Sequence, residues 1–143
     1  MTLTLTLLPE NLAVCRLAPD DPFPDWAQGS NLVTFTRTPD ELSIVCENNV
    51  VPENITAERD WRALKLQGPL DFSIVGILSA LTAILAKAEI SIFALSTYDT
   101  DYVLLKGINL TRGIETLQDA GYELSNLKFN KREQDSSSLR FSE

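Results

Sequence analysis

Two carboxylates, Asp99 and Asp101, lie two positions apart and are candidates for an acid–base pair. Paired carboxylates can take up different pKa values and act as acid and base without a histidine. The 143 residues include no histidine, which excludes Ser–His–Asp catalysis, Cys–His catalysis and nearly every histidine-containing zinc site. No nucleophile, phosphate-binding loop or metal-ligand spacing accompanies the pair. We therefore expect the protein not to be an enzyme, and the two carboxylates are also typical of a solvated turn.

The cysteines offer little further chemistry. Cys15 and Cys46 are the two cysteines of the chain, too few for a disulfide framework or a four-thiolate metal site. Both lie inside apolar runs, which favours reduced, buried thiols over a redox role. We therefore predict no metal ion and no other cofactor.

Charge and hydropathy argue against two classes of partner. Lys and Arg total 12 against 20 Asp and Glu, a formal charge of −8, so no basic patch is available to bind nucleic acid. The uncharged stretch 72–86 is too short and too mixed to span a membrane. Residues 1–8 alternate Thr with Leu and have no positive segment, which is typical of a strand rather than of a signal peptide. We expect a cytoplasmic protein without nucleic-acid or membrane partners.

The elements that would position these residues follow from the spacing of apolar residues. In the first half, strands are expected where apolar residues alternate or run together: 2–8, 12–17, 31–36 and 42–46. Residues 25–29 allow at most one helical turn. The polar stretch 50–60, which contains a proline, is expected to be a connector.

A long apolar helix is predicted early in the second half. Six apolar residues recur at three- and four-residue spacing, as on one face of a helix: Ile74, Ile77, Leu78, Leu81, Ile84 and Leu85. Asp71 or Ser73 is expected to cap this helix, because its first amides need an acceptor.

The second half as a whole has the element order of a ferredoxin-like fold. Strands are expected on both sides of that helix, followed by a second helix and a last strand: strands 61–66, 91–96 and 101–106, a helix from Asn109 to Gly121, and a strand at 122–129. The order strand-helix-strand-strand-helix-strand predicts an α+β unit with two helices on one face of a four-stranded antiparallel sheet.

The first half repeats a short pattern of the second. Thr38 and Asp40 precede one expected strand as Thr97 and Asp99 precede another, at a constant offset of 59 residues. Because a single half would bury too little surface to be stable alone, we expect two coupled units in tandem. Their predicted extents, followed by a flexible polar tail, are 1–58, 59–130 and 131–143.

Two segments of the second half, 70–78 and 90–103, resemble the ACT-domain family. The resemblance rests on a helix that begins near a Gly-Ile pair, an Ile-Ser-Ile run and a strand that ends in Ser-Thr: Gly76-Ile77, Ile90-Ser91-Ile92 and Ser96-Thr97. The pattern is similar to that of small tandem-ACT proteins, of the regulatory domains of aspartate kinases and of cytosolic arginine sensors. It covers residues 61–122, and the first half fits only as a divergent ACT unit.

The resemblance implies a fold, a function and a set of ligand contacts. The fold is two ferredoxin-like units in tandem, the first with a reduced first helix. The function is non-catalytic regulation by a homodimer that binds a free amino acid or a similar small metabolite between ACT units and acts on a partner enzyme. Six residues occupy motif positions that contact ligand: Asp71, Gly76, Ile77, Thr97, Tyr98 and Asp101. Ile74 stands where the arginine-sensing relatives have an acidic residue, which favours an apolar or small amino acid.

These positions suit the two charges of a free amino acid. The start of the helix offers backbone amides and the positive end of its dipole to a carboxylate, while Asp99 and Asp101 offer acceptors to an ammonium group. Each residue also has a structural interpretation: Asp71 as a helix cap, the two carboxylates in a turn, and Tyr98 as an aromatic on the sheet surface. A module that dimerises or binds a protein without any ligand is therefore the alternative function.

Overall fold

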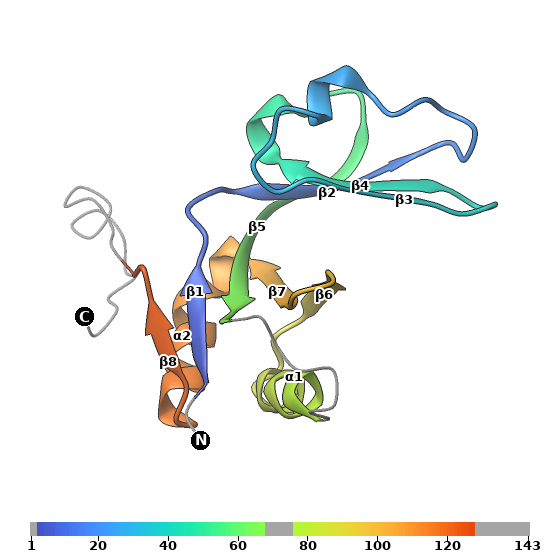
Figure 1. Ribbon diagram of the computed structural model, residues 1–143. Coiled ribbons are helices and arrows are strands. Elements are labelled where there is room, and N and C mark those ends of the chain that lie inside the picture. The colour runs from blue at the N-terminus through green and yellow to red at the C-terminus, as the bar shows by residue number, and fades with distance from the viewer. Residues whose placement is uncertain (1–2, 68–75, 128–143) are drawn as a thin grey trace. The chain divides into compact units, whose positions relative to one another are not determined.

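The structure, a computed structural model, describes residues 3–67 and 76–127 (Figure 1). The chain forms two compact units. We call Pro9–Arg62 the β-unit, and Met1–Leu8 together with Ala63–Glu143 the helical unit. In the described ranges, no helix is long and apolar enough to cross a membrane.

The described part of the helical unit contains two α-helices and a sheet. Its elements in chain order are β1 (Thr4–Leu7), the end of β5 (Thr56–Leu66), α1 (Ile77–Lys87), β6 (Ile92–Ser96), β7 (Asp101–Lys106), α2 (Leu110–Asp119) and β8 (Glu123–Ser125). A 3-10 turn, Gly107–Asn109, leads into α2. From β5 to β8 the order of strands and helices is the predicted one. The end of the predicted last strand and the predicted polar tail lie outside the described residues.

Strand β1 lies between β5 and β8, so the sheet order in this unit is β8-β1-β5-β7-β6. It runs antiparallel to β5, with Leu5 opposite Leu66, and parallel to β8, with Thr4 opposite Glu123. The sheet is therefore mixed, and the predicted purely antiparallel sheet is wrong on this point. The cause is that β1 comes from the other end of the chain and separates β5 from β8. For the same reason the unit boundaries differ from the predicted division between residues 58 and 59.

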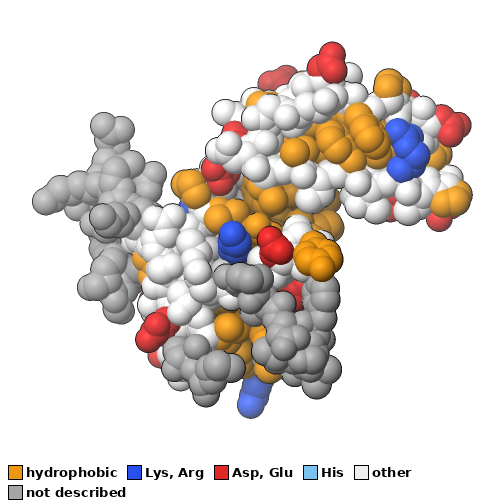
Figure 2. Space-filling model, viewed as in Figure 1, with side chains coloured by type: hydrophobic (Ala, Val, Ile, Leu, Met, Phe, Trp, Pro, Cys, Tyr) orange, Lys and Arg blue, Asp and Glu red, His pale blue; other side chains and the backbone are white. Residues whose placement is uncertain are grey.

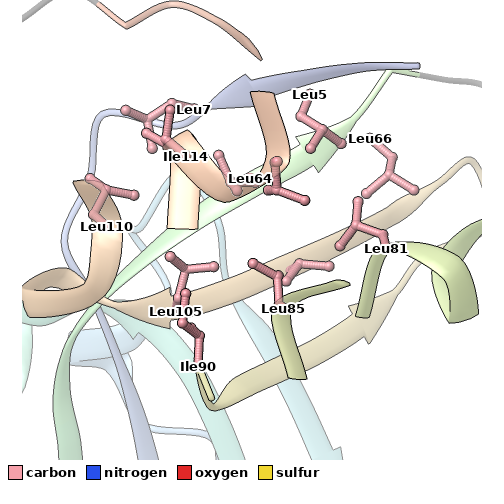
Figure 3. Close-up of a cluster of buried hydrophobic side chains, with 12 residues drawn as sticks. Leu5, Leu7, Leu64, Leu66, Leu81, Leu85, Ile90, Leu105, Leu110 and Ile114 are labelled. Atoms are coloured by element: carbon pink, nitrogen blue, oxygen red, sulfur yellow. The ribbon is translucent and has the colours of Figure 1, made fainter. Parts of the chain in front are cut away.

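The core of the helical unit lies between its sheet and its two helices (Figure 3). Alternate strand residues such as Leu5 and Leu7 face the same side, because side chains along a strand point alternately to opposite faces. Leu81 and Leu85 from α1 and Ile114 from α2 cover them. The buried residues of this cluster are Leu5, Leu7, Leu64, Leu66, Leu81, Leu85, Ile90, Val103, Leu105, Leu110, Ile114 and Leu117.

Helix α1 begins later than the apolar spacing predicted. Its first residue is Ile77, and its N-cap is Gly76, whose φ of 84° is left-handed. A left-handed residue cannot continue a helix toward the N-terminus, and glycine takes this conformation at little cost. The residues predicted to cap this helix, Asp71 and Ser73, lie outside the described part of the chain.

The β-unit is a small antiparallel sheet without an α-helix in residues 9–62. Its strands are β2 (Leu12–Leu17), β3 (Thr34–Arg37), β4 (Leu42–Glu47) and the first part of β5, in the order β3-β4-β2-β5. Two 3-10 turns lie in the connections between strands: Asp25–Ala27 between β2 and β3, and Asn48–Val50 between β4 and β5. The unit thus lacks both helices of a ferredoxin-like unit, and the expectation of two tandem ACT units is not confirmed.

Strand β5 begins inside the stretch that was expected to be a connector. Thr56 starts the strand, and a register shift in its pairing with β2 lies near Asp60, whose φ is 67°. Asp60 is held by Asn48, which accepts a hydrogen bond from its amide at 3.2 Å and donates one to its carboxylate at 3.3 Å. The local polarity that suggested a connector is that of an irregular strand whose bulge is satisfied by side-chain hydrogen bonds.

Aromatic and basic side chains meet on the surface of the β-unit. The Phe23 and Phe35 rings are stacked with centroids 4.5 Å apart, and the Arg37 guanidinium lies 5.0 Å from the Phe23 centroid. Figure 2 shows hydrophobic and basic side chains next to one another on the visible face of this unit. Because an offset stack and a cation over a ring are favourable arrangements, these contacts fix the Pro-rich loop before β3.

Candidate functional site

The β6–β7 turn and the end of β5 meet at one end of the sheet of the helical unit. The two strands run antiparallel, and their last pair before the turn is Ser96 with Asp101. Thr100, which is buried, donates from Oγ1 to the carbonyl oxygen of Leu66 at 2.8 Å. The turn that contains the predicted ligand contacts is therefore attached to the last residue of β5.

The start of α1 lies at the same end of the sheet. At its other end, α1 passes into Ile90, whose amide donates to the Leu85 carbonyl at 3.0 Å, and Leu105 near the end of β7 packs in the same core. Ile77, the first residue of α1, lines a hollow together with Leu3, which precedes β1 at the end of the sheet where β5 ends. Figure 3 agrees, because Leu81 of α1 lies near Leu66 there. The fold thus brings Gly76 and Ile77 to the end of the sheet that carries Thr97, Tyr98 and Asp101.

The side chains in the turn already have partners within the turn. Thr97 Oγ1 accepts from the Thr100 amide at 3.3 Å and lies 3.1 Å from the Thr100 carbonyl oxygen, to which it donates. Ser96 donates a short hydrogen bond to Asp101. Tyr98 is 84% exposed.

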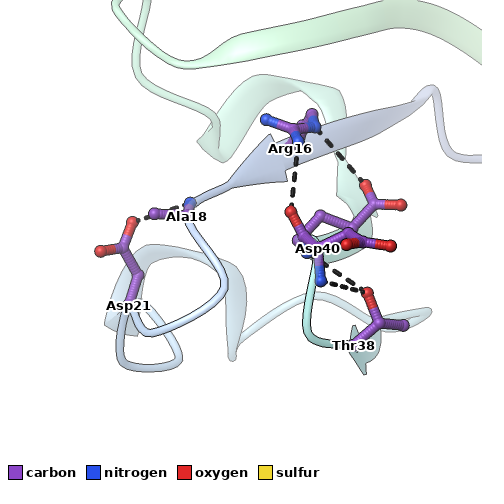
Figure 4. Close-up of polar contacts among 6 residues, drawn as sticks. Arg16, Ala18, Asp21, Thr38 and Asp40 are labelled. Carbon is purple, nitrogen blue, oxygen red and sulfur yellow. Dashed lines mark hydrogen bonds and ion pairs between the residues drawn. The ribbon is translucent and has the colours of Figure 1, made fainter.

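The Thr38–Glu41 turn of the β-unit, which matches the β6–β7 turn in sequence, is closed by similar hydrogen bonds (Figure 4). Thr38 Oγ1 accepts from the amides of Asp40 at 3.1 Å and Glu41 at 3.2 Å, and the Thr38 amide donates to the Glu41 carbonyl at 2.9 Å. Threonine hydroxyls commonly close tight turns in this way. Hairpin geometry therefore accounts for the repeated Thr-x-Asp pattern without a duplicated ACT unit.

The start of α1 supplies backbone donors to this end of the sheet. Among the described residues no side chain caps the start of α1, where the first amides and the positive end of the helix dipole lie. Gly76 is exposed and Ile77 is half-buried. A carboxylate is the ligand that such a terminus favours. Asp71, the remaining predicted contact, lies outside the described residues.

A hollow beside α1 contains residues that the sequence did not single out. Its volume is about 260 Å³. Apolar residues from three parts of the helical unit line it: Leu3, Ile77, Ala80, Ile84, Ala120, Gly121 and Tyr122. The spacing of Ile77 and Ile84 was interpreted as a core face, and nothing in the local sequence places Leu3 beside Tyr122.

The cysteines form a second local cluster, in the core of the β-unit. Cys15 and Cys46 are both free and buried, as predicted. A hydrogen bond between the two side chains lowers the pKa of Cys15 and raises the pKa of Cys46. Burial raises both pKa values as well, and the positive charge of Arg59 lowers both.

Comparisons with known families divide the chain at the start of β5. A model of the ACT domain matches residues 56–119, and a model of the N-terminal domain of another protein group matches residues 10–54. A search of curated proteins finds no match. The ACT match begins with β5 and ends with α2, so it includes the start of α1 and the β6–β7 turn.

Three solved structures share the fold. A crystal structure of an Agobacterium tumefaciens protein is 34% identical, with a TM-score of 0.82 over 87% of this chain and 92% of that chain. A Vibrio cholerae protein of unknown function is 17% identical, with a TM-score of 0.68 over 82% of this chain and 89% of that chain. The ligand-free regulatory subunit of aspartate kinase from Thermus thermophilus is 10% identical, with a TM-score of 0.57 over 79% of this chain and 93% of that chain.

The first of these relatives is similar along nearly its whole length, and the other two are similar in fold alone. Together with the ACT match, they confirm the family resemblance that the helix start and the strand motifs predicted. The segment 56–119 belongs to the ACT-domain family, and the chain is similar in fold to the regulatory subunit of aspartate kinase from Thermus thermophilus.

Proposed function

We propose that this protein is a non-catalytic regulator that binds a free amino acid at the end of the sheet where α1 begins. The observation that carries the proposal is the ACT match over residues 56–119, which contains both the start of α1 and the β6–β7 turn. Binding there would regulate a partner enzyme.

The two ends of the site suit the two charges of the ligand. The amides after Gly76 would hold the carboxylate, aided by the helix dipole. Asp99 and Asp101 would accept hydrogen bonds from the ammonium group. A second ACT unit from another copy of the chain would complete the site. The ligand would then favour one arrangement of the two copies by its higher affinity for that arrangement.

Thermal unfolding in the presence of each of the twenty amino acids tests the proposal. A ligand at 100 times its dissociation constant stabilises the folded state by about 2.7 kcal/mol, which raises the melting temperature of a protein of this size by several degrees. We expect a selective rise for a small or apolar amino acid, because Ile74 stands where the arginine-sensing relatives have an acidic residue. A panel in which no amino acid raises the melting temperature would contradict the proposal.

Matched variants separate binding from stability. Gly76→Ala and Gly121→Ala both place a side chain at a left-handed φ, 84° and 102°, where no neighbouring atom lies within 4 Å of the new Cβ. Each strains the backbone by roughly 1–2 kcal/mol. We expect both to lower the melting temperature and Gly76→Ala alone to abolish the ligand-induced rise. Asp101→Asn should weaken that rise more than Asp99→Asn, because Asp101 is the half-buried member of the pair.

A second candidate function rests on strand β6. This strand pairs with β7 alone among the described strands and consists of Ile-Phe-Ala-Leu-Ser, without a charge or a proline. Natural sheet edges usually carry such protective residues, and an edge without them is a template for another strand. We propose edge-to-edge pairing of β6 between two copies as the route to a homodimer. A protein that dimerises through β6 and binds no amino acid would be an interaction module rather than a sensor.

A further inference from the structure

The hollow beside α1 lies on the outer side of the core of the helical unit. Four of its lining residues are half-buried and pack against that core: Leu3, Ile77, Ile84 and Tyr122. The other three are small and exposed: Ala80, Ala120 and Gly121. The lining therefore consists of large side chains that rest on the core and of small residues that reach solvent.

Main-chain hydrogen bonds fix the part of the lining that α1 does not supply. Gly121, whose φ of 102° is left-handed, follows the end of α2. The Tyr122 amide then donates to the Leu117 carbonyl at 3.1 Å, as in a common helix-ending motif. The next amide, that of Glu123, donates to the Leu3 carbonyl at 3.0 Å. Tyr122 and Leu3 are thus held side by side before any ligand binds, which lowers the ordering cost of binding.

The hollow reaches the first turn of α1, where the carboxylate of the proposed ligand would lie. The Ala80 amide donates to the Gly76 carbonyl at 2.9 Å, so the three amides before it, 77–79, precede the first bond within the helix. Ile77 supplies one of these amides, and its side chain lines the hollow. With Ile84 it marks a stripe about 10 Å long on α1. A ligand held by these amides therefore has the hollow within reach of its side chain.

The chemistry of the lining favours an apolar group. None of the seven lining residues is charged, and Tyr122 has the one polar side-chain atom among them. A polar group buried there would lose its water without gaining partners, whereas an apolar group gains from leaving water. The volume of about 260 Å³ is slightly below the roughly 300–1,000 Å³ of sites for drug-sized molecules. The hollow is therefore of a size for part of a small metabolite.

We propose that the hollow binds the side chain of the regulatory amino acid, and that this ligand has a long aliphatic side chain such as that of leucine. The inference rests on the proposed function and narrows its ligand class. The start of α1 would hold the carboxylate that all amino acids share, and the hollow would select among them. Glycine and alanine would leave the hollow unfilled and bind weakly.

Isothermal titration calorimetry of the full chain with four amino acids of increasing length tests the proposal: alanine, 2-aminobutyrate, norvaline and leucine. We expect the dissociation constant to fall about fourfold for each added carbon, because a buried methylene group favours binding by about this factor. Leucine should then bind about sixtyfold more tightly than alanine. Valine should bind more tightly than threonine, in which a hydroxyl group replaces one methyl group.

A matched pair of variants assigns this dependence to the hollow. Ala80→Phe places a ring in the hollow, whereas Ala83→Phe adds the same ring at an exposed position of α1 outside the lining. In Ala80→Phe we expect leucine to bind no more than about fourfold more tightly than alanine, since the ring takes the space of the added carbons. Ala83→Phe should keep the dependence of the parent. Circular dichroism must show that both variants are folded.

The possible outcomes separate this inference from the proposed function. Equal affinities for the four ligands, or a length dependence that persists in Ala80→Phe, would overturn the inference and leave the proposed function standing. Binding of none of the four would also contradict the inference, and the panel of twenty amino acids would then decide the proposed function. Sedimentation of the ligand-free protein tests a different occupant. If Ala80→Phe dissociates a dimer that Ala83→Phe leaves intact, a second copy fills the hollow and the inference is wrong.

Discussion

At Gly113, in the middle of α2, the helix lies close to the Leu105 side chain of β7. A Cβ at this position would stand 2.8 Å from Leu105 Cδ1, closer than carbon atoms pack. Leu105 is fully buried, so its side chain cannot turn into free space. The glycine therefore allows α2 to pack against the Leu105 side chain at this distance.

Replacing Gly113 by alanine should destabilise the protein, although alanine is the better helix former by about 1 kcal/mol. Overpacking a filled core costs about 1–3 kcal/mol, so we expect a net loss of about 1 kcal/mol in urea unfolding. In a cycle with Leu105→Ala, which removes the clash, the two changes should be less than additive by at least about 0.5 kcal/mol. A more stable Gly113→Ala protein would show that α2 is free to move away from β7.

The residues of the candidate site show what single-residue chemistry can predict. Thr97 and Asp101 were recognised because hydroxyl and carboxylate groups suit an amino-acid ligand, and the fold does bring them to the end of the sheet where α1 begins. The same groups also suit a hairpin turn, and in the structure they bond within it. Sequence cannot separate the two roles, because a turn and a ligand use the same donors and acceptors.

Among the elements, those defined by local spacing were predicted well. Helix α2 and strand β7 have the predicted bounds within two residues, because their apolar residues recur at the periods of a helix and a strand. Strand β5 and helix α1 were misplaced at their starts. In both cases a residue with positive φ, Asp60 or Gly76, lies near the misplaced boundary. The spacing of apolar residues does not reveal a positive φ, so the sequence pattern could not locate either boundary.

Strand β6 is the element whose exposed edge has the clearest consequence. A lysine on an edge strand opposes pairing with another strand, because its charge would have to be buried. Ala94→Lys, at an exposed position of β6, should therefore weaken dimerisation at least about tenfold, a change of about 1.4 kcal/mol. Sedimentation equilibrium over a range of protein concentrations measures this change.

The matched control adds the same charge away from the sheet edge. Ala86→Lys lies at an exposed position of α1 and should leave the association constant unchanged. If both variants associate as the parent does, the sheet edge is not the dimer contact, and if only Ala86→Lys dissociates, the helical face is.

At the scale of the whole molecule, strand β1 joins the beginning of the chain to strands from its second half. Strand β1 pairs with β5 and with β8, so Thr4 lies beside Glu123, 119 positions further along the chain. No local pattern reveals such a contact, and strand pairing over this distance is the least predictable part of a fold. This is why the sequence placed residues 1–8 with the first half. It also means that a fragment covering residues 59–130 lacks an interior strand of its own sheet.

Leu5→Ala tests how far this strand supports the molecule. Leu5 is fully buried in the core of the helical unit, and truncating a buried leucine costs about 2–5 kcal/mol. Thr6→Ala, whose side chain points away from that core and is bonded to Ser125 at 3.0 Å, should cost less than about 1 kcal/mol. Urea unfolding followed by circular dichroism at helix wavelengths reports this loss, since both described α-helices belong to the helical unit.

Tryptophan fluorescence reports the other unit, because Trp26 and Trp61 both lie in the β-unit. That unit has fewer than about 60 residues, the size at which a domain is marginal by itself, and its buried cluster is small. Strand β5 also runs through the ladders of both units. We therefore expect Leu5→Ala to shift the fluorescence and dichroism midpoints to the same lower urea concentration. A fluorescence midpoint that stays in place while the dichroism midpoint falls would show that the β-unit folds by itself.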